Sequence, residues 1–236
     1  MSMLIAAALA FLAIHFFISG TPLREGITGA IGEGPYMGLF ALASLATLVW
    51  LVMSYNAAEV SADNRTLNNF GVGVKHAAIP IVALAFLLGV QGLFAKNPTR
   101  VRMEAAASDE GAIRGVVRIT RHPFLWGVVI WSAFHLTANG DLASVIFFGT
   151  FFVLALFGTA SIDAKRKRKL GPAWDAFAAK TSNLPFAAII AGRNQFAAGE
   201  TFGWRFWAAA AIFAAILFAH AWLFSASPFP NGWRPF

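Results

Sequence analysis

Long apolar runs recur along this chain, and they constrain its fold more than any other feature. Short polar or basic stretches separate them, and no carboxylate falls inside any run. A helix needs roughly 20 apolar residues to cross a bilayer. A hydrophobic content of 58% over 236 residues is also too high for a soluble domain of this size. The six runs cover approximately 1–20, 35–54, 72–96, 124–136, 142–160 and 204–224.

This pattern predicts an all-α polytopic membrane protein, a six-transmembrane-helix bundle that forms a single domain over residues 1–236. The first run lacks a basic start and a clear small-residue cleavage site, so we interpret it as a transmembrane helix and not as a signal peptide. The stretch after it carries Gly29, Gly32 and Gly34, which predicts a loop.

The basic residues are strongly asymmetric. The loops after the first, third and fifth predicted helices hold all but three of the 18 lysines and arginines. Because basic loops face the cytoplasm, this predicts a protein of the bacterial inner (cytoplasmic) membrane with both termini periplasmic. The KRKRK run at 165–169 fits a membrane lipid headgroup anchor, and the net charge of +7 does not call for a nucleic-acid partner. The three exceptions are Arg65, Lys75 and Arg234.

Residues 118–149 predict a helical hairpin with a basic opening. Pro123 suits the first turn of a helix, Asn139-Gly140 predicts a tight turn, and Asp141 suits the N-cap of the next helix. Three basic side chains at a helix N-terminus could bind an anion such as a carboxylate, a phosphate or a lipid headgroup. The alternative is a simple positive-inside anchor. These side chains are Arg118, Arg121 and His122.

Four histidines lie inside the predicted helices, where an unpartnered imidazole is costly. At about 1.5 Å per residue, His76, His135 and His220 fall in the outer half of the membrane, and His15 lies nearer the cytoplasm. Each one alone fits a side chain hydrogen-bonded to a backbone carbonyl. The depth shared by three of them favours a cofactor site, because imidazole is a common ligand of haem iron and of zinc.

Haem fits the available donors better than zinc. The chain has no cysteine, and a closed zinc site would need nearly all of the histidines. Two histidines suffice for haem b, whose pocket Phe and Trp side chains would line. Without a C-x-x-C-H motif the haem would be non-covalent. We therefore expect haem binding through His135, with the second ligand open among His15, His76 and His220.

Several segments resemble the NnrU family, whose relatives include the plant 15-cis-ζ-carotene isomerase. The resemblance covers nearly the whole chain, and RHPFLWG with WSAFHLTANGDLASVIFFG is its most specific part. The other segments are HFFISGTPLR at 15–24, GEGPYMGLFALASL at 32–45, KHAAIP at 75–80 and HAWLFSASPFP at 220–230.

The resemblance implies functions of two kinds. Relatives of the isomerase type imply a haem b membrane enzyme that converts a cis double bond of an apolar polyene, with His15 and His135 as the iron ligands. Those relatives carry a cysteine near the second histidine, where this chain has Ser132. The wider family implies a role in nitrite and nitric oxide metabolism, as a sensor, a handling protein or a maturation factor, without isomerase activity.

A second resemblance points to another class of enzyme. RHP-x-x-x-G at 121–127 and LGPAWDAFAAKTSNLP at 170–185 are similar to isoprenylcysteine and phospholipid methyltransferases, which bind S-adenosylmethionine at the cytoplasmic face. The paired glutamates typical of those enzymes are missing, and Asp163-Ala164 followed by five basic residues stands in their place. We expect a shared fold in which the methyltransferase site has been lost. An S-adenosylmethionine-dependent methyl transfer at the opening formed by Arg121 and His122 is the third functional hypothesis.

Overall fold

The computed structural model describes residues 1–68, 72–229 and 232, without the side chains of 72, 73 and 75. Over this part of the chain the protein is helical, with one isolated bridge and no strand, so the predicted all-α class is confirmed. Arg234 lies outside the described residues. The chain forms two compact units, one of residues 1–70 and 135–154, and one of residues 71–134 and 155–236.

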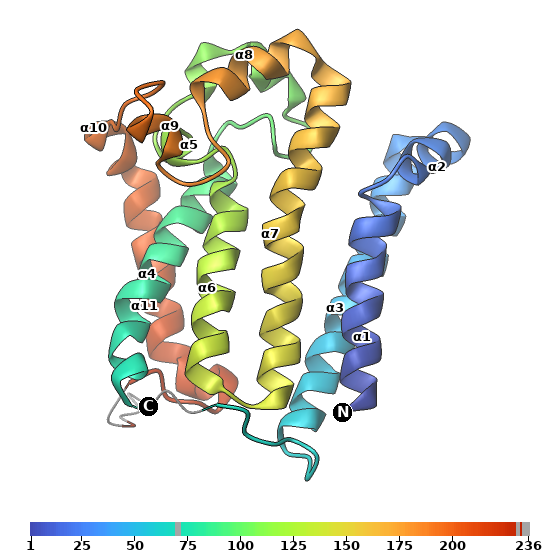
Figure 1. Cartoon of the computed structure of the whole chain (residues 1–236), viewed down its shortest axis with the longest axis vertical. Coiled ribbons are helices and arrows are strands. Elements are labelled where there is room, and N and C mark those ends of the chain that lie inside the picture. Colours follow the sequence, from blue (N-terminus) through green and yellow to red (C-terminus); the bar gives the residue numbers. More distant parts are fainter. Residues whose placement is uncertain (69–71, 230–231, 233–236) are drawn as a thin grey trace. The chain divides into compact units, whose positions relative to one another are not determined.

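The first unit is built on two helices that pack side by side, α1 (Ser2–Ala13) and α3 (Glu33–Glu59) (Figure 1). Between them lie a short π-helix, η1 (Ile14–Ile18), and α2 (Leu23–Ile31). Small and large apolar side chains interlock in the core of this unit, which also receives residues from the hairpin. The buried core residues are Leu4, Ala7, Ala8, Phe11, Leu51, Ala58 and Ala143.

The predicted loop after the first helix is wrong, because α2 is helical. Leu23, Ile27 and Ile31 recur every four residues and so share one face of this helix. The chain bends by 76° between the α1–η1 segment and α2. Gly32, with a φ of +86°, then ends α2, a conformation that glycine adopts without steric cost.

The polar stretch after α3 pairs with the predicted hairpin turn. Leu67 and Asn68 donate backbone hydrogen bonds to the Gly140 carbonyl at 2.8 and 3.1 Å, and Leu142 N donates to Arg65 O at 3.0 Å. Gly140 has a φ of +69°, and a Cβ there would collide with the backbone of Asn68. The turn therefore needs glycine for both its conformation and its close packing.

The long helices of the second unit are α4 (Val72–Phe94), α11 (Trp204–Phe224), and parts of α6 (Pro123–Asn139) and α7 (Leu142–Leu170). Helices α4 and α11 pack together along their length (Figure 1). Helices α4 and α6 approach closely at Gly89 and Gly127. A Cβ on Gly127 would lie 2.7 Å from the Gly89 Cα and 2.6 Å from the Ala85 oxygen. Small residues at this crossing allow the two backbones to touch.

One end of the second unit carries short elements around a compact core. Helix α7 continues to Leu170, so the KRKRK run is helical and not part of a loop as predicted. Val117, Trp174 and Phe177 are buried in this core. The short elements are η2 (Glu104–Ser108), η3 (Glu110–Ala112), α5 (Val116–Ile119), α8 (Pro172–Lys180), α9 (Ala187–Ile190) and α10 (Ala198–Thr201).

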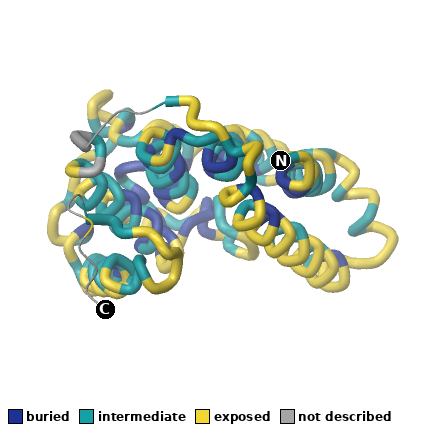
Figure 2. Tube along the Cα trace, turned by 90° about the horizontal axis from the view of Figure 1, so that it is seen from below, coloured by how far each residue is buried: buried dark blue, intermediate teal, exposed yellow. Residues whose placement is uncertain are grey.

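Within the described residues, four helices are long and apolar enough to cross a membrane, namely α3, residues 76–94 of α4, α7 and α11. The bent pair of α1–η1 and α2 makes a fifth if it counts as one span. Most of their surface is exposed or half-buried (Figure 2). On α3 the exposed Leu39, Leu42 and Leu45 form an apolar stripe at helical spacing, which suits contact with lipid. The six-helix count stays a prediction, since α6 has only 17 residues.

Candidate functional site

Two of the histidines predicted to bind a cofactor, His15 and His135, belong to the first unit. His15 lies in the π-helix η1, and such irregular turns occur frequently at functional sites. Its Nδ1 lies 2.7 Å from the Phe11 carbonyl oxygen, which can only accept, so the Nδ1–H group donates the hydrogen bond. The lone pair of the ring is then on Nε2, so His15 has the tautomer that a metal-binding histidine needs.

A row of phenylalanine rings connects these two histidines. His135 stacks on Phe148 with 4.7 Å between ring centroids. The row continues through Phe147 and Phe151, with neighbouring centroids 5.2 Å apart. Phe151 meets Phe11 at 5.8 Å, and Phe11 meets His15 at 4.5 Å. Helices α1, α6 and α7 thus contribute one continuous aromatic surface that begins and ends with an imidazole.

The residue types in this row suit haem b, whose iron commonly takes imidazole ligands. The described residues contain no cluster of three or more His, Cys, Asp or Glu side chains that could hold a metal ion, which disfavours a zinc site. Two imidazoles with an apolar aromatic wall are sufficient for haem. His15 and His135 lie at different levels of the unit, since four phenylalanine rings separate them, and the row does not bring the two imidazoles to one iron.

His76 and His220 belong to the second unit. Phe94 meets Trp204 with ring centroids 5.6 Å apart, and Phe86 meets Phe213 at 5.7 Å, which sets the register of antiparallel α4 and α11. This register places His76 and His220 at the same end of the pair. His76 is exposed, and the His220 Nδ1 lies 2.8 Å from the Ala226 carbonyl oxygen.

The basic opening predicted before α6 is bound to an acidic residue of α7. Arg121 Nε lies 3.0 Å from both carboxylate oxygens of Asp163, and Arg121 Nη2 lies 2.7 Å from Oδ2. His122 Nε2 lies 2.6 Å from Asp163 Oδ1, and His122 is only 2% exposed. The Arg121 guanidinium also lies over the Trp174 ring at 5.6 Å. This Asp163 cluster, made of Arg121, His122 and Asp163, fastens the start of α6 to α7.

Arg118 has a different partner. Its Nε donates to Glu200 Oε2 at 2.8 Å, and its Nη1 donates to Asn194 Oδ1 at 2.9 Å. The hydrogen bonds that Glu200 accepts from Arg118 and from the Gly115 backbone, with the neighbouring charge of Arg114, hold the pKa of Glu200 down to about 2. Arg118 also lines a polar surface pocket of about 440 Å³ together with Lys180 and Arg193.

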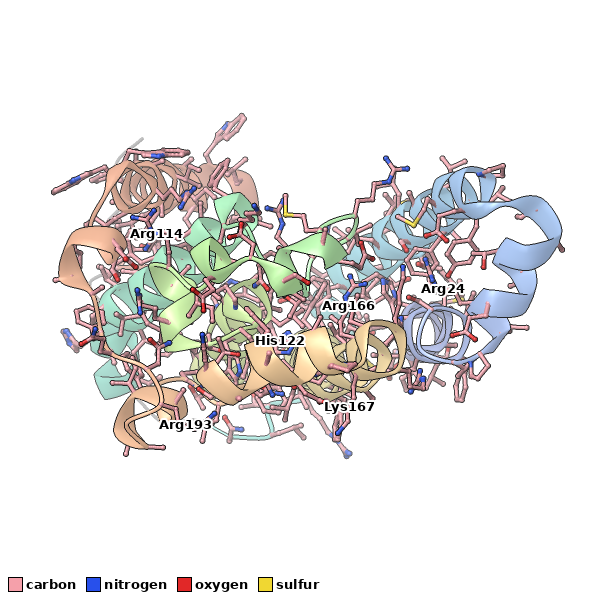
Figure 3. The ribbon with its side chains drawn as sticks, turned by 90° about the horizontal axis from the view of Figure 1, so that it is seen from above. Arg24, Arg114, His122, Arg166, Lys167 and Arg193 are labelled. Carbon is pink, nitrogen blue, oxygen red and sulfur yellow. The ribbon has the colours of Figure 1, made fainter. Side chains whose placement is uncertain are left out.

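The basic side chains near the end of α7 differ in burial. Arg166 is buried and donates to Glu104 Oε1 at 2.5 Å, whereas the Lys167 side chain is 69% exposed. Figure 3 shows these two residues on opposite sides of α7, with His122 beside the same helix. Arg166 of the KRKRK run therefore fixes the fold, whereas the Lys167 side chain is exposed.

The NnrU family model, described as NnrU protein, matches residues 3–228 of the chain. The chain belongs to the NnrU family. This match includes both units and all five histidines. The resemblance inferred from the sequence segments is thus confirmed at the level of the family.

Two curated relatives of this NnrU chain are chloroplastic 15-cis-zeta-carotene isomerases. The one from Zea mays is 29% identical over 178 residues, which is 73% of this chain and 47% of the relative. The one from Arabidopsis thaliana is 27% identical over 195 residues, which is 79% of this chain and 50% of the relative. The chain therefore spans about half the length of these relatives. No solved structure matches it.

Two site features were not predicted from the sequence. Asp163 stands where the resembling methyltransferases carry glutamates. Its pairing with Arg121 and His122 was not predicted. Ser132, at the position of the relatives' cysteine, is buried and donates to its own helix at Val128 O over 2.7 Å. A basic pair directly before an apolar helix was the available signal for a buried acidic partner.

Proposed function

We propose that this NnrU chain is a haem b-binding membrane enzyme of the isomerase type, acting on a cis double bond of a long apolar polyene. The observation that carries this proposal is the aromatic row between His15 and His135. The similarity to two 15-cis-zeta-carotene isomerases supports the same class of substrate.

In this proposal His15 and His135 are the candidate ligands of the haem iron, and the row keeps their rings at different levels. The Phe11 carbonyl fixes the proton of His15 on Nδ1, which keeps the Nε2 lone pair available for iron. Phe148 stacks on His135 and restricts the rotation of its ring. When bound, the haem supplies an iron centre that can change oxidation state and interact with the electrons of a double bond.

The phenylalanine row has a second role in the proposal. Phe147, Phe148 and Phe151 present an apolar wall that would bind a polyene by dispersion and would keep water away from it. The wall carries no acid or base of its own. Selection of the substrate would therefore depend on shape and length, and not on hydrogen bonding.

We also propose the topology predicted from the basic residues, with six membrane crossings, cytoplasmic basic loops and periplasmic termini in a bacterial inner membrane. The counts of lysine and arginine support it. Reporter fusions after Asn68 and after Lys180 test it, because they should report opposite compartments. The same compartment for both would contradict this topology.

The enzymatic proposal is tested in a host that accumulates 15-cis-ζ-carotene. Production of the chain with sufficient haem should reduce the 15-cis isomer, and His135→Ala should abolish this effect at an equal protein level. Persistence of the 15-cis isomer with haem-loaded protein would reject isomerase activity. The second candidate, which family membership favours, is a haem protein that senses or handles nitric oxide, and it predicts a spectral change when nitric oxide is added.

A further inference from the structure

Tyr36, at the start of α3, carries a buried hydroxyl group that makes no hydrogen bond within the described part of the chain. The residue is 4% exposed. A buried hydroxyl without a partner is unfavourable and uncommon in native proteins. Tyr55, the other tyrosine, shows the usual situation, since its hydroxyl lies 3.1 Å from Ser144 Oγ. The Tyr36 hydroxyl is therefore a donor that suits a bound group.

Tyr36 extends the aromatic row beyond His15. Its ring stacks on Phe40 at 5.9 Å and 17°, and the Phe40 ring lies edge-on to His15 at 5.4 Å. The three residues lie in the first unit, on α3 and η1. A group bound to His15 would thus lie one aromatic ring away from Tyr36.

Arg24 brings a positive charge to the same place. The 76° bend before α2 turns this helix toward α3, and the Arg24 guanidinium lies over the Tyr36 ring, 5.3 Å from its centroid. Arg24 also pairs with Glu33, whose side chain is 55% exposed. The Arg24 side chain is 21% exposed in this pair, and its guanidinium has five N–H donors, so Arg24 can also donate to a second anion.

We propose that Tyr36 and Arg24 form an oxyanion site beside His15 that binds a carboxylate of the porphyrin. This inference rests on the proposed function, because the carboxylate belongs to the haem that His15 would hold. Hydroxyl and guanidinium groups both donate to carboxylate and phosphate oxygens. The phosphate of a lipid headgroup offers the same chemistry, so the experiment separates these two sources.

The first arm compares haem with haem dimethyl ester, in which both carboxylates are blocked. Purified full-length protein in alkyl maltoside should bind haem more tightly than the ester, as measured by absorbance titration. Tyr36→Phe removes only the hydroxyl, and Arg24→Gln removes the charge together with the guanidinium donors. Each should reduce haem affinity about tenfold while leaving ester affinity unchanged. Tyr55→Phe is the matched control and should keep the preference for haem.

The second arm measures thermal stability in alkyl maltoside with and without short-chain phosphatidic acid. If lipid phosphate occupies the site, this lipid should raise the Tm of the wild type more than that of Tyr36→Phe. If the protein binds no haem but shows this effect, the oxyanion site stands and the haem function fails. If haem binds no more tightly than its ester, and the lipid raises the Tm of Tyr36→Phe as much as that of the wild type, the oxyanion site is rejected and the haem function stands. If no haem binds, and the lipid raises the Tm of the wild type and of Tyr36→Phe equally, both the oxyanion site and the haem function are rejected.

The ligand-free protein gives an independent readout. Because the Tyr36 hydroxyl has no partner there, Tyr36→Phe should leave the Tm unchanged or raise it, whereas Tyr55→Phe should lower it. A loss of stability in ligand-free Tyr36→Phe equal to that of Tyr55→Phe would show that the hydroxyl is already satisfied by the fold, and would overturn the inference.

Discussion

His122 Nε2 lies 2.6 Å from Asp163 Oδ1, and the same carboxylate receives three hydrogen-bond contacts of 2.7 to 3.0 Å from Arg121. The side chains of His122, Arg121 and Asp163 are 1%, 14% and 18% exposed. One carboxylate thus neutralises a buried guanidinium and orients a buried imidazole. The cluster joins the start of α6 to a residue of α7 that lies 42 positions after Arg121.

Asp163→Asn should destabilise the protein by about 3 kcal/mol, because it leaves the Arg121 charge buried without its counter-ion. The measurement is the free energy of unfolding in mixed micelles. Asp175→Asn is the matched control. Its partner Lys167 is 3.8 Å away and both side chains are more than half exposed, so the loss should stay below about 1 kcal/mol. Equal losses in the two variants would contradict the role given to the Asp163 cluster.

Stability should fall on mild acidification because of His122. Burial lowers the pKa of His122, and this outweighs the opposing effect of the Asp163 carboxylate. The unfolded chain, with a histidine pKa of about 6.5, then binds a proton that the folded chain does not. The free energy of unfolding should therefore decrease as the pH falls below about 6.5. His122→Gln keeps an N–H donor but cannot titrate, so its profile should be flatter between pH 7 and 5. Superimposable profiles would refute this prediction.

The Arg118–Glu200 pair should respond at lower pH. The pKa of Glu200 is about 2, held down mainly by its hydrogen bonds from Arg118. Since the folded pKa is depressed, the stabilisation is complete above about pH 4.5 and is lost as the pH falls toward 2. Glu200→Gln should be less stable than the wild type at neutral pH by less than about 1 kcal/mol. This difference should shrink below pH 4.5, and a constant difference would show that Glu200 acts without its charge.

Gly140→Ala should destabilise the hairpin turn by at least about 1–2 kcal/mol, because it forces a left-handed conformation on alanine and a collision with Asn68. Gly149→Ala is the control, since a Cβ there meets nothing within 4 Å and alanine favours the helix. Thermal unfolding of the two variants checks the prediction. A Tm for Gly140→Ala at or above that of Gly149→Ala would contradict the close packing.

Local sequence signals predicted much of this fold. Pro123 begins α6, and Asp141 Oδ1 accepts from Ser144 N at 3.0 Å at the start of α7, as a helix N-cap does. The helix at 23–31 was missed because glycines suggested a loop, although the spacing of Leu23, Ile27 and Ile31 supports a helix. Helix and loop differ little in free energy in such a segment, and packing against α3 and η1 decides between them.

The candidate site depended on contacts that local patterns do not encode. Asp163 lies 42 residues after Arg121, and nothing near either position specifies the pairing. The row from His15 to His135 joins three helices, and a widened turn at 14–18 cannot be read from periodicity. Tyr36 was not predicted as a site residue, because only the fold shows that its hydroxyl is buried without a partner.

The visible absorption spectrum of the purified protein, produced with sufficient haem, tests the central claim most directly. The wild type should show the band of a non-covalent haem b. His15→Ala and His135→Ala should each weaken or abolish this band, while His220→Ala, which belongs to the second unit and lies outside the aromatic row, should retain it. A well-folded wild-type protein that remains colourless, or a haem band that survives both His15→Ala and His135→Ala, would contradict the account.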